Sequence, residues 1–158
     1  FLEDNGFKVV GAHEILKDLV VESANFTKLL PNEQDKSDIE IAIKVVKELG
    51  KLDIGQATIV QNGAVLGVEA MEGTDNLIKR CSTLKHSEHY GGVLIKFSKP
   101  GQELRTDLPT IGIETVKNMH IAGFKGIAIE ANRAIFLDRE EAISYANKHD
   151  MFILALNT

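Results

Sequence analysis

The stretch "QATIVQNGAVLGVEA" (residues 56–70) is the strongest local structural signal in the chain. Two runs rich in apolar and β-branched residues flank Asn62-Gly63, a pair well suited to a type I′ turn between antiparallel strands. We therefore predict a β-hairpin with its turn at Asn62 and Gly63. A hairpin commits this part of the chain to a sheet, which the flanking segments must complete and cover.

The segments on both sides of the hairpin alternate between helical and extended patterns. Helices are predicted at 12–21, 35–49, 73–86, 112–123 and from Asp138, where Asp138 and Glu141 suggest a capping box; strands are predicted at 7–11, 92–98, 126–131, 133–138 and 151–156. The runs 126–131 and 133–138 look like a second strand pair around Asn132. This order predicts an α/β fold, with a mixed sheet that contains hairpins and is flanked by helices.

Composition limits the classes of protein to which the chain can belong. Its 158 residues are 44% apolar and 26% charged, which is typical of one globular domain with a buried core. The net charge of −5 disfavours a nucleic-acid partner, because such surfaces are normally basic. No apolar run approaches the roughly 18 residues that span a bilayer. The single cysteine, Cys81, is interpreted as a small buried residue.

Polar clusters follow or precede three of the predicted strands, where α/β proteins collect functional groups. In "LDIGQ" (52–56), Asp53 and Gln56 bracket a glycine, which is also typical of a simple helix-to-strand turn. The interpretation as a turn is favoured for this first cluster.

The second cluster is "VEAMEGTD" (68–75), which contains Glu69, Glu72 and Asp75. Three carboxylates at a strand-to-helix crossing can hold a hard cation, and the amides of a helix N-terminus attract phosphate. Thr74 is a candidate N-cap for that helix. The alternative is that Glu72 and Asp75 only complement the helix dipole.

The third cluster, "KPGQELRTDLPTIG" (99–112), holds more charge than a connector needs. With the lysine just before it, its polar side chains are Lys96, Lys99, Gln102, Glu103, Arg105, Asp107 and Thr110. Lysine and arginine bind phosphate oxygens, a carboxylate ligates a metal or orients water, and Thr110 could cap the next helix. The alternative is a solvated loop with paired charges.

Together the clusters favour phosphoryl chemistry. Cleavage of a diphosphate requires neutralised oxygens and a water placed in line, and a divalent metal assists both. His86 and His89 are three residues apart, but their polar surroundings are more typical of solvated side chains than of a metal pair. The sequence contains no Walker loop, dinucleotide fingerprint or zinc-type cysteine spacing.

Several runs resemble one known family. They are "GAHEIL", "LDIGQ", "VEAMEGTD", "LIKR", "KFSKPGQELRTDLPTIG" and "GIAIEA". In this order they are similar to the C-terminal domain of the LpxI-type UDP-2,3-diacylglucosamine pyrophosphatases, over nearly the whole chain. The resemblance implies that residues 1–20 lead from an N-terminal domain and that residues 21–158 form the catalytic domain.

The resemblance implies Mg²⁺-dependent hydrolysis of UDP-2,3-diacylglucosamine to UMP and 2,3-diacylglucosamine 1-phosphate, a step of lipid A synthesis in Gram-negative bacteria. It also implies a cytoplasmic protein at the inner membrane, bound peripherally, whose N-terminal domain closes with this one around the substrate. Monomer and homodimer both remain open. If the N-terminal domain supplies essential groups, the alternative is a domain that binds the diacylated sugar phosphate without catalysis.

The resemblance also implies roles for individual residues. Asp107 best matches the aspartate that is central to metal-assisted cleavage, and Glu69, Glu72 and Asp75 are expected to join it as metal ligands. The residues expected to bind substrate or phosphate are Lys96, Lys99, Gln102, Arg105, Thr74 and Thr110. Glu103 stands where we expect an aspartate in the family, so metal binding by Glu103 instead of Asp107 stays open.

Overall fold

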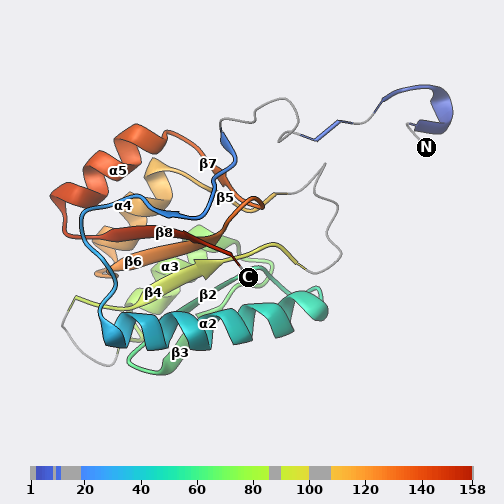
Figure 1. The fold of residues 1–158 in the computed structure, drawn as a ribbon. Coiled ribbons are helices and arrows are strands. Elements are labelled where there is room, and N and C mark those ends of the chain that lie inside the picture. Colours follow the sequence, from blue (N-terminus) through green and yellow to red (C-terminus); the bar gives the residue numbers. More distant parts are fainter. Residues whose placement is uncertain (1–2, 9, 12–18, 86–89, 100–107, 158) are drawn as a thin grey trace.

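A computed structural model describes residues 3–8, 10–11, 19–85, 90–99 and 108–157, and the structural statements below refer to these residues. A six-stranded mixed sheet forms the centre of the fold, with the spatial order β1-β8-β6-β4-β2-β3 (Figure 1). Its strands are β1 (Ala24–Asn25), β2 (Ala57–Gln61), β3 (Ala64–Val68), β4 (Val93–Lys96), β6 (Gly126–Glu130) and β8 (Phe152–Leu156). Two short parallel strands, β5 (Thr110–Ile111) and β7 (Ile135–Phe136), pair separately. The predicted α/β class is confirmed.

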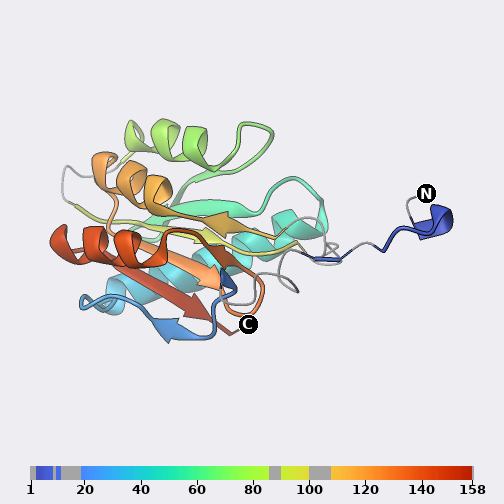
Figure 2. The ribbon, with the colours of Figure 1, turned by 90° about the horizontal axis from the view of Figure 1, so that it is seen from above.

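Helices cover both faces of the sheet. The helices are η1 (Glu3–Asn5), α2 (Glu33–Lys51), α3 (Thr74–Ser82), α4 (Ile113–Ile121) and α5 (Arg139–Lys148). Figure 2 shows α2 on one side of the sheet and α3, α4 and α5 on the other. Each side has its own apolar cluster, the larger one beneath the three shorter helices.

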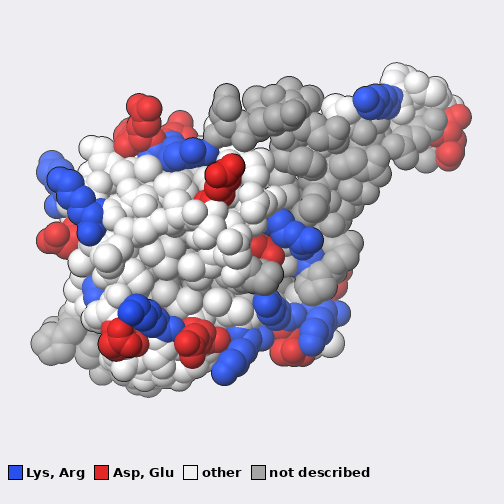
Figure 3. Space-filling view, viewed as in Figure 1, with Lys and Arg blue, Asp and Glu red and all other residues white. Residues whose placement is uncertain are grey.

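The long helix α2 presents charge to solvent and apolar side chains to the sheet. It begins with a capping box between Asn32 and Asp35, and Ile39, Ala42 and Val46 are buried on its inner side. Figure 3 shows lysines and acidic residues interspersed along its outer side. This separation of the two faces is the pattern expected of a helix that packs on a sheet.

The predicted hairpin is confirmed. Asn62 and Gly63 both have positive φ values, 52° and 80°, as a type I′ turn requires. Asp38, which is 1% exposed, accepts hydrogen bonds from the backbone N–H of Asn62 at 2.9 Å and of Gly63 at 2.7 Å. The turn is therefore fixed from α2 as well as by its own residues.

Three strands at the centre of the sheet run in parallel: β4 pairs with β6, and β6 pairs with β8. Their residues are nearly all buried, as their apolar sequences predict. Strand β2 is antiparallel to both β3 and β4, so β3, β4, β6 and β8 end at the edge where β2 begins. We call this edge the carboxyl edge.

The second predicted strand pair, 126–131 with 133–138, is wrong. Strand β6 has β4 on one side and β8 on the other, so no pairing position remains for the strand that follows it. That strand, β7, pairs with β5 instead. The predicted strand at 7–11 is also not a strand at its described positions.

Three further predictions have different outcomes. The capping box at Asp138 is wrong, because Asp138 precedes α5 in the left-handed conformation, with φ 48°, and makes no side-chain cap bond. Cys81 is buried as expected, and burial raises the pKa of its thiol. The predicted helix at 12–21 lies mostly outside the described residues.

Candidate functional site at the carboxyl edge

The first two polar clusters of the sequence touch each other at the carboxyl edge. A Cβ placed on Gly55 would lie 2.0 Å from the backbone oxygen of Glu69, so only glycine allows this approach. The next residue, Gln56, donates its backbone N–H to Oε2 of Glu69 at 3.2 Å. The glycine of "LDIGQ" is thus required by contact with the second cluster and not by a turn alone.

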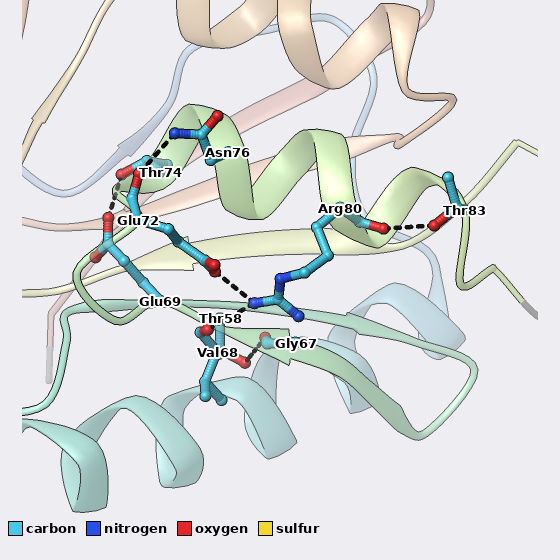
Figure 4. A network of polar contacts seen from close by, with 9 residues as sticks. All are labelled: Thr58, Gly67, Val68, Glu69, Glu72, Thr74, Asn76, Arg80 and Thr83. Atoms are coloured by element: carbon cyan, nitrogen blue, oxygen red, sulfur yellow. Dashed lines mark hydrogen bonds and ion pairs between the residues drawn. The ribbon is translucent and has the colours of Figure 1, made fainter.

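Glu69 is the buried carboxylate of this contact. It follows β3, is 6% exposed, and accepts a hydrogen bond on Oε1 from the hydroxyl of Thr74 at 2.7 Å (Figure 4). Thr74 was predicted to cap α3, and this is wrong: Gly73 is the N-cap residue, with φ 79°, and the Thr74 hydroxyl binds Glu69 instead. This hydrogen bond therefore ties Thr74, the first residue of α3, to the buried Glu69 carboxylate.

Glu72 and Asp75 are engaged elsewhere. Glu72, which precedes α3, forms an ion pair with Arg80 of that helix, and this hydrogen bond raises the pKa of the Arg80 guanidinium (Figure 4). Arg80 also donates to the backbone oxygen of Val68 at 3.1 Å. Asp75 accepts a hydrogen bond from the amide of Asn118 on α4 at 3.1 Å.

These placements bear on the predicted metal ligands Glu69, Glu72 and Asp75. In the part of the chain that the structure describes, no three acidic, histidine or cysteine side chains form a group that could hold a metal ion. The metal roles of the three residues stay predictions.

The described part of the third cluster also lies at the carboxyl edge. Lys96, the last residue of β4, donates from Nζ to the backbone oxygen of Thr110 at 3.1 Å. Lys99 forms an ion pair with Asp53 of the first cluster at 2.8 Å, and its side chain is 24% exposed. Both lysines therefore reach the edge at which Glu69 lies.

Thr110 does not cap α4 as predicted. Gly112 is the N-cap residue of that helix, and the Thr110 hydroxyl donates to the backbone oxygen of Leu108 at 3.1 Å. The cause is the strand β5, which holds Thr110 two residues before the cap position. Its expected contact with phosphate stays a prediction.

The remaining predicted site residues lie outside the described ranges. They are Gln102, Glu103, Arg105 and Asp107; the loop histidines His86 and His89, interpreted as solvated, also lie outside these ranges. The residues on either side of the first group, Lys99 and Leu108, are described.

Sequence reasoning missed one polar pair at this edge. Glu130, which ends β6 and is 9% exposed, accepts hydrogen bonds on Oε2 from the backbone N–H of Ser98 at 3.0 Å and from the Ser98 hydroxyl. The available signal was the lone acid at the end of the buried run "GIAIE". The predicted hairpin of 126–131 with 133–138 gives this acid no role beyond its place in a strand.

A groove of about 350 Å³ opens between α3 and α4. Asp75, Lys79 and Asn118 line it together with the exposed Ile121. Asp75 faces this groove and contacts α4 through Asn118. It takes no part in the contact between Gly55 and Glu69.

An α/β domain whose separate polar loops converge on the carboxyl edge of its sheet has the usual arrangement of a ligand-binding domain of this class. The family model for the LpxI C-terminal domain matches residues 22–154, and the chain belongs to that family. A protein of Caulobacter vibrioides (strain ATCC 19089 / CIP 103742 / CB 15), named UDP-2,3-diacylglucosamine pyrophosphatase LpxI, is 40% identical over 160 residues. The match covers 98% of this chain and 57% of that protein, so the chain spans just over half of its relative's length.

Among the described residues, no helix is both long enough and apolar enough to cross a membrane.

Proposed function

We propose that this chain is the catalytic C-terminal part of an enzyme that hydrolyses the diphosphate of UDP-2,3-diacylglucosamine. The products would be UMP and 2,3-diacylglucosamine 1-phosphate, and the pathway would be lipid A synthesis. Membership of the family and the name of the 40% identical relative support this substrate. The greater length of that relative supports an N-terminal domain as the partner of this one. We propose further that the protein is cytoplasmic and binds peripherally to the inner membrane.

The observation that carries the proposal is the meeting of three separate chain segments at the carboxyl edge. Gly55 contacts Glu69, Lys99 pairs with Asp53, and Lys96 holds Thr110. Lys96, Lys99 and the buried carboxylate of Glu69 therefore lie at the same edge of the sheet. A diphosphate requires cationic groups for its non-bridging oxygens, and these lysines can supply them.

The chain's own residues would divide the chemistry as follows. Lys96 and Lys99, with Gln102 and Arg105, bind the diphosphate oxygens, and the first amides of α3 add donors near Thr74. Asp107 orients the attacking water or ligates the metal. Asp107 directly precedes Leu108 in the sequence. The backbone oxygen of Leu108 accepts a hydrogen bond from the Thr110 hydroxyl at the carboxyl edge. This nearness in sequence supports the assignment of Asp107 to the site.

Magnesium fits the described residues in part. Glu69 is an oxygen ligand of the kind that Mg²⁺ takes, while Glu72 is paired with Arg80 and Asp75 contacts Asn118. We propose Glu69 and Asp107 as the first ligands to test, with Glu103 as the alternative to Asp107. When bound, Mg²⁺ would neutralise charge on the diphosphate.

The test uses the full-length protein and measures UMP released from UDP-2,3-diacylglucosamine. The variant Asp107→Ala should lose Mg²⁺-dependent UMP release by a factor of at least about 100 while keeping its melting temperature. A matched control is Glu114→Gln, an exposed acid that pairs only locally with Lys117 on α4. Turnover near wild type in the Asp107 variant would remove this mechanism.

A second candidate function follows from the length of the chain. Because it spans 57% of its relative, essential groups can come from the other part of the protein, and this domain would then only bind the diacylated sugar phosphate. Calorimetry of this chain with 2,3-diacylglucosamine 1-phosphate separates the two. Binding without UMP release by the isolated chain supports the second function, and no binding by folded protein counts against it.

A further inference from the structure

We propose that Glu130 is a positioning residue for the reaction: it fixes the exit of β4, and with it the position of Lys99. The inference rests on the proposed function, because it concerns the same site. No side chain of β6 was among the predicted site residues, and Glu130 acts through Ser98 and not on the substrate.

The contact is built into the end of the sheet. The parallel pairing of β4 with β6 ends where Lys96 lies opposite Ile129. The next residue, Phe97, turns its N–H to the other side, where the backbone oxygen of Gln56 accepts it at 3.0 Å. Ser98 then faces β6 again, and the carboxylate of Glu130 accepts its N–H at 3.0 Å in place of a backbone oxygen.

A carboxylate is a stronger acceptor than the backbone oxygen that it replaces. It also takes the Ser98 hydroxyl on the same oxygen, so two donors of one residue are bound by one buried side chain. This double contact fixes the direction in which the chain leaves β4. Lys99 follows directly, and its Nζ lies 2.8 Å from Asp53.

The charge of Glu130 calls for a functional explanation. A carboxylate is rarely placed in a buried position for packing alone, and here one of its oxygens holds both donors of Ser98. Its bonds to Ser98 fix the backbone that presents Lys99, and reaction rates are sensitive to displacements of about 1 Å. Glu130 would therefore contribute more to turnover than to stability.

The experiment compares the full-length variants Glu130→Ala, Glu130→Gln and Ser98→Ala with wild type and with the control Glu114→Gln. The readouts are kcat and KM for UMP release, the melting temperature, and amide hydrogen exchange at Ser98. We expect Glu130→Ala to lower kcat by roughly 10- to 100-fold. Glu130→Gln, which keeps an acceptor oxygen, should recover most of kcat, and Ser98→Ala should fall between them.

Exchange at Ser98 should be slow in wild type and in Glu130→Gln and fast in Glu130→Ala. A kcat of Glu130→Ala within twofold of wild type, with only the melting temperature lowered, would overturn the positioning role. If Glu130→Ala does not fold, the other two variants decide. Fast exchange of the residue 98 amide in Ser98→Ala and in Glu130→Gln, with kcat unchanged in both, would overturn the positioning role. If wild type releases no UMP, the proposed function fails, while the exchange measurement still decides whether Glu130 fixes Ser98.

Discussion

Gly55 and Glu69 lie in such close contact that a Cβ added to Gly55 would be 2.0 Å from the backbone oxygen of Glu69. The contact joins the segment that enters β2 to the segment that leaves β3. It places the Gln56 N–H on the Glu69 carboxylate and so brings two sequence clusters to one edge of the sheet. The geometry of the candidate site depends on this glycine.

The variant Gly55→Ala should be strongly destabilising. The added methyl group meets backbone atoms, which cannot rotate away, so the cost should reach about 3 kcal/mol in the free energy of unfolding. Urea denaturation measures it. The matched control is Gly91→Ala, where the nearest atom to an added Cβ is 3.6 Å away, an ordinary contact. Equal stability of the two variants would show that the close approach is not present.

The variant Thr74→Val should destabilise the protein by about 1–3 kcal/mol, because it removes a donor from the buried Glu69 carboxylate while keeping the side-chain volume. Thr74→Ser keeps the hydroxyl and should be nearly neutral. Chemical denaturation of both variants checks this. A loss in Thr74→Ser without a loss in Thr74→Val would mean that the methyl group, and not the hydroxyl, matters.

The variant Asp38→Ala should lower stability without lowering kcat per folded molecule. It leaves the backbone N–H groups of Asn62 and Gly63 without their buried acceptor, at a cost of about 1–3 kcal/mol. The hairpin turn lies at the edge opposite to the candidate site, since β2 ends there. A large loss of kcat, with the protein folded, would contradict the placement of the site at the carboxyl edge.

Stability should depend on pH through His120. Burial, and then the neighbouring His149, lower the pKa of the His120 imidazole below its usual value. The ring centroids of the two histidines are 4.0 Å apart, and the Tyr145 hydroxyl lies 3.0 Å from His120 Nδ1. A base with a lowered pKa binds its proton less readily in the folded state than in the unfolded chain. The free energy of unfolding should therefore fall as pH drops from about 7 through about 6.5 and below.

Urea denaturation at several pH values between 7 and 5 measures this dependence, in wild type and in His120→Gln. The variant should show a flatter profile because the titrating group is absent. Identical slopes in the two proteins would exclude His120 as the cause.

The sequence was most informative where local rules decide the structure. The turn at Asn62 and Gly63 follows from backbone preferences, and the buried strand at 93–96 follows from its apolar run. It was least informative about pairing over long distances. Nothing local distinguishes a hairpin at Asn132 from two strands that enter different sheets, because neighbours distant in sequence decide it.

The same limit applies to the candidate site. Residue types placed Glu69, Lys96 and Lys99 in polar clusters, but their partners depend on the tertiary fold. Thr74 and Thr110 look like helix caps from their neighbours, yet a glycine takes each cap position and each hydroxyl is used elsewhere. Glu130 was missed because its partner, Ser98, is 32 residues away.

The most direct test of the proposed site replaces Mg²⁺ with paramagnetic Mn²⁺ in the isotope-labelled full-length protein and records amide NMR signals. A bound Mn²⁺ broadens the signals of nearby amides, whatever the activity. The account predicts broadening of residues 69–75 and 96–99, and little change at 61–63 on the opposite edge. Broadening centred on 61–63, or none at the carboxyl edge at saturating Mn²⁺, would contradict it.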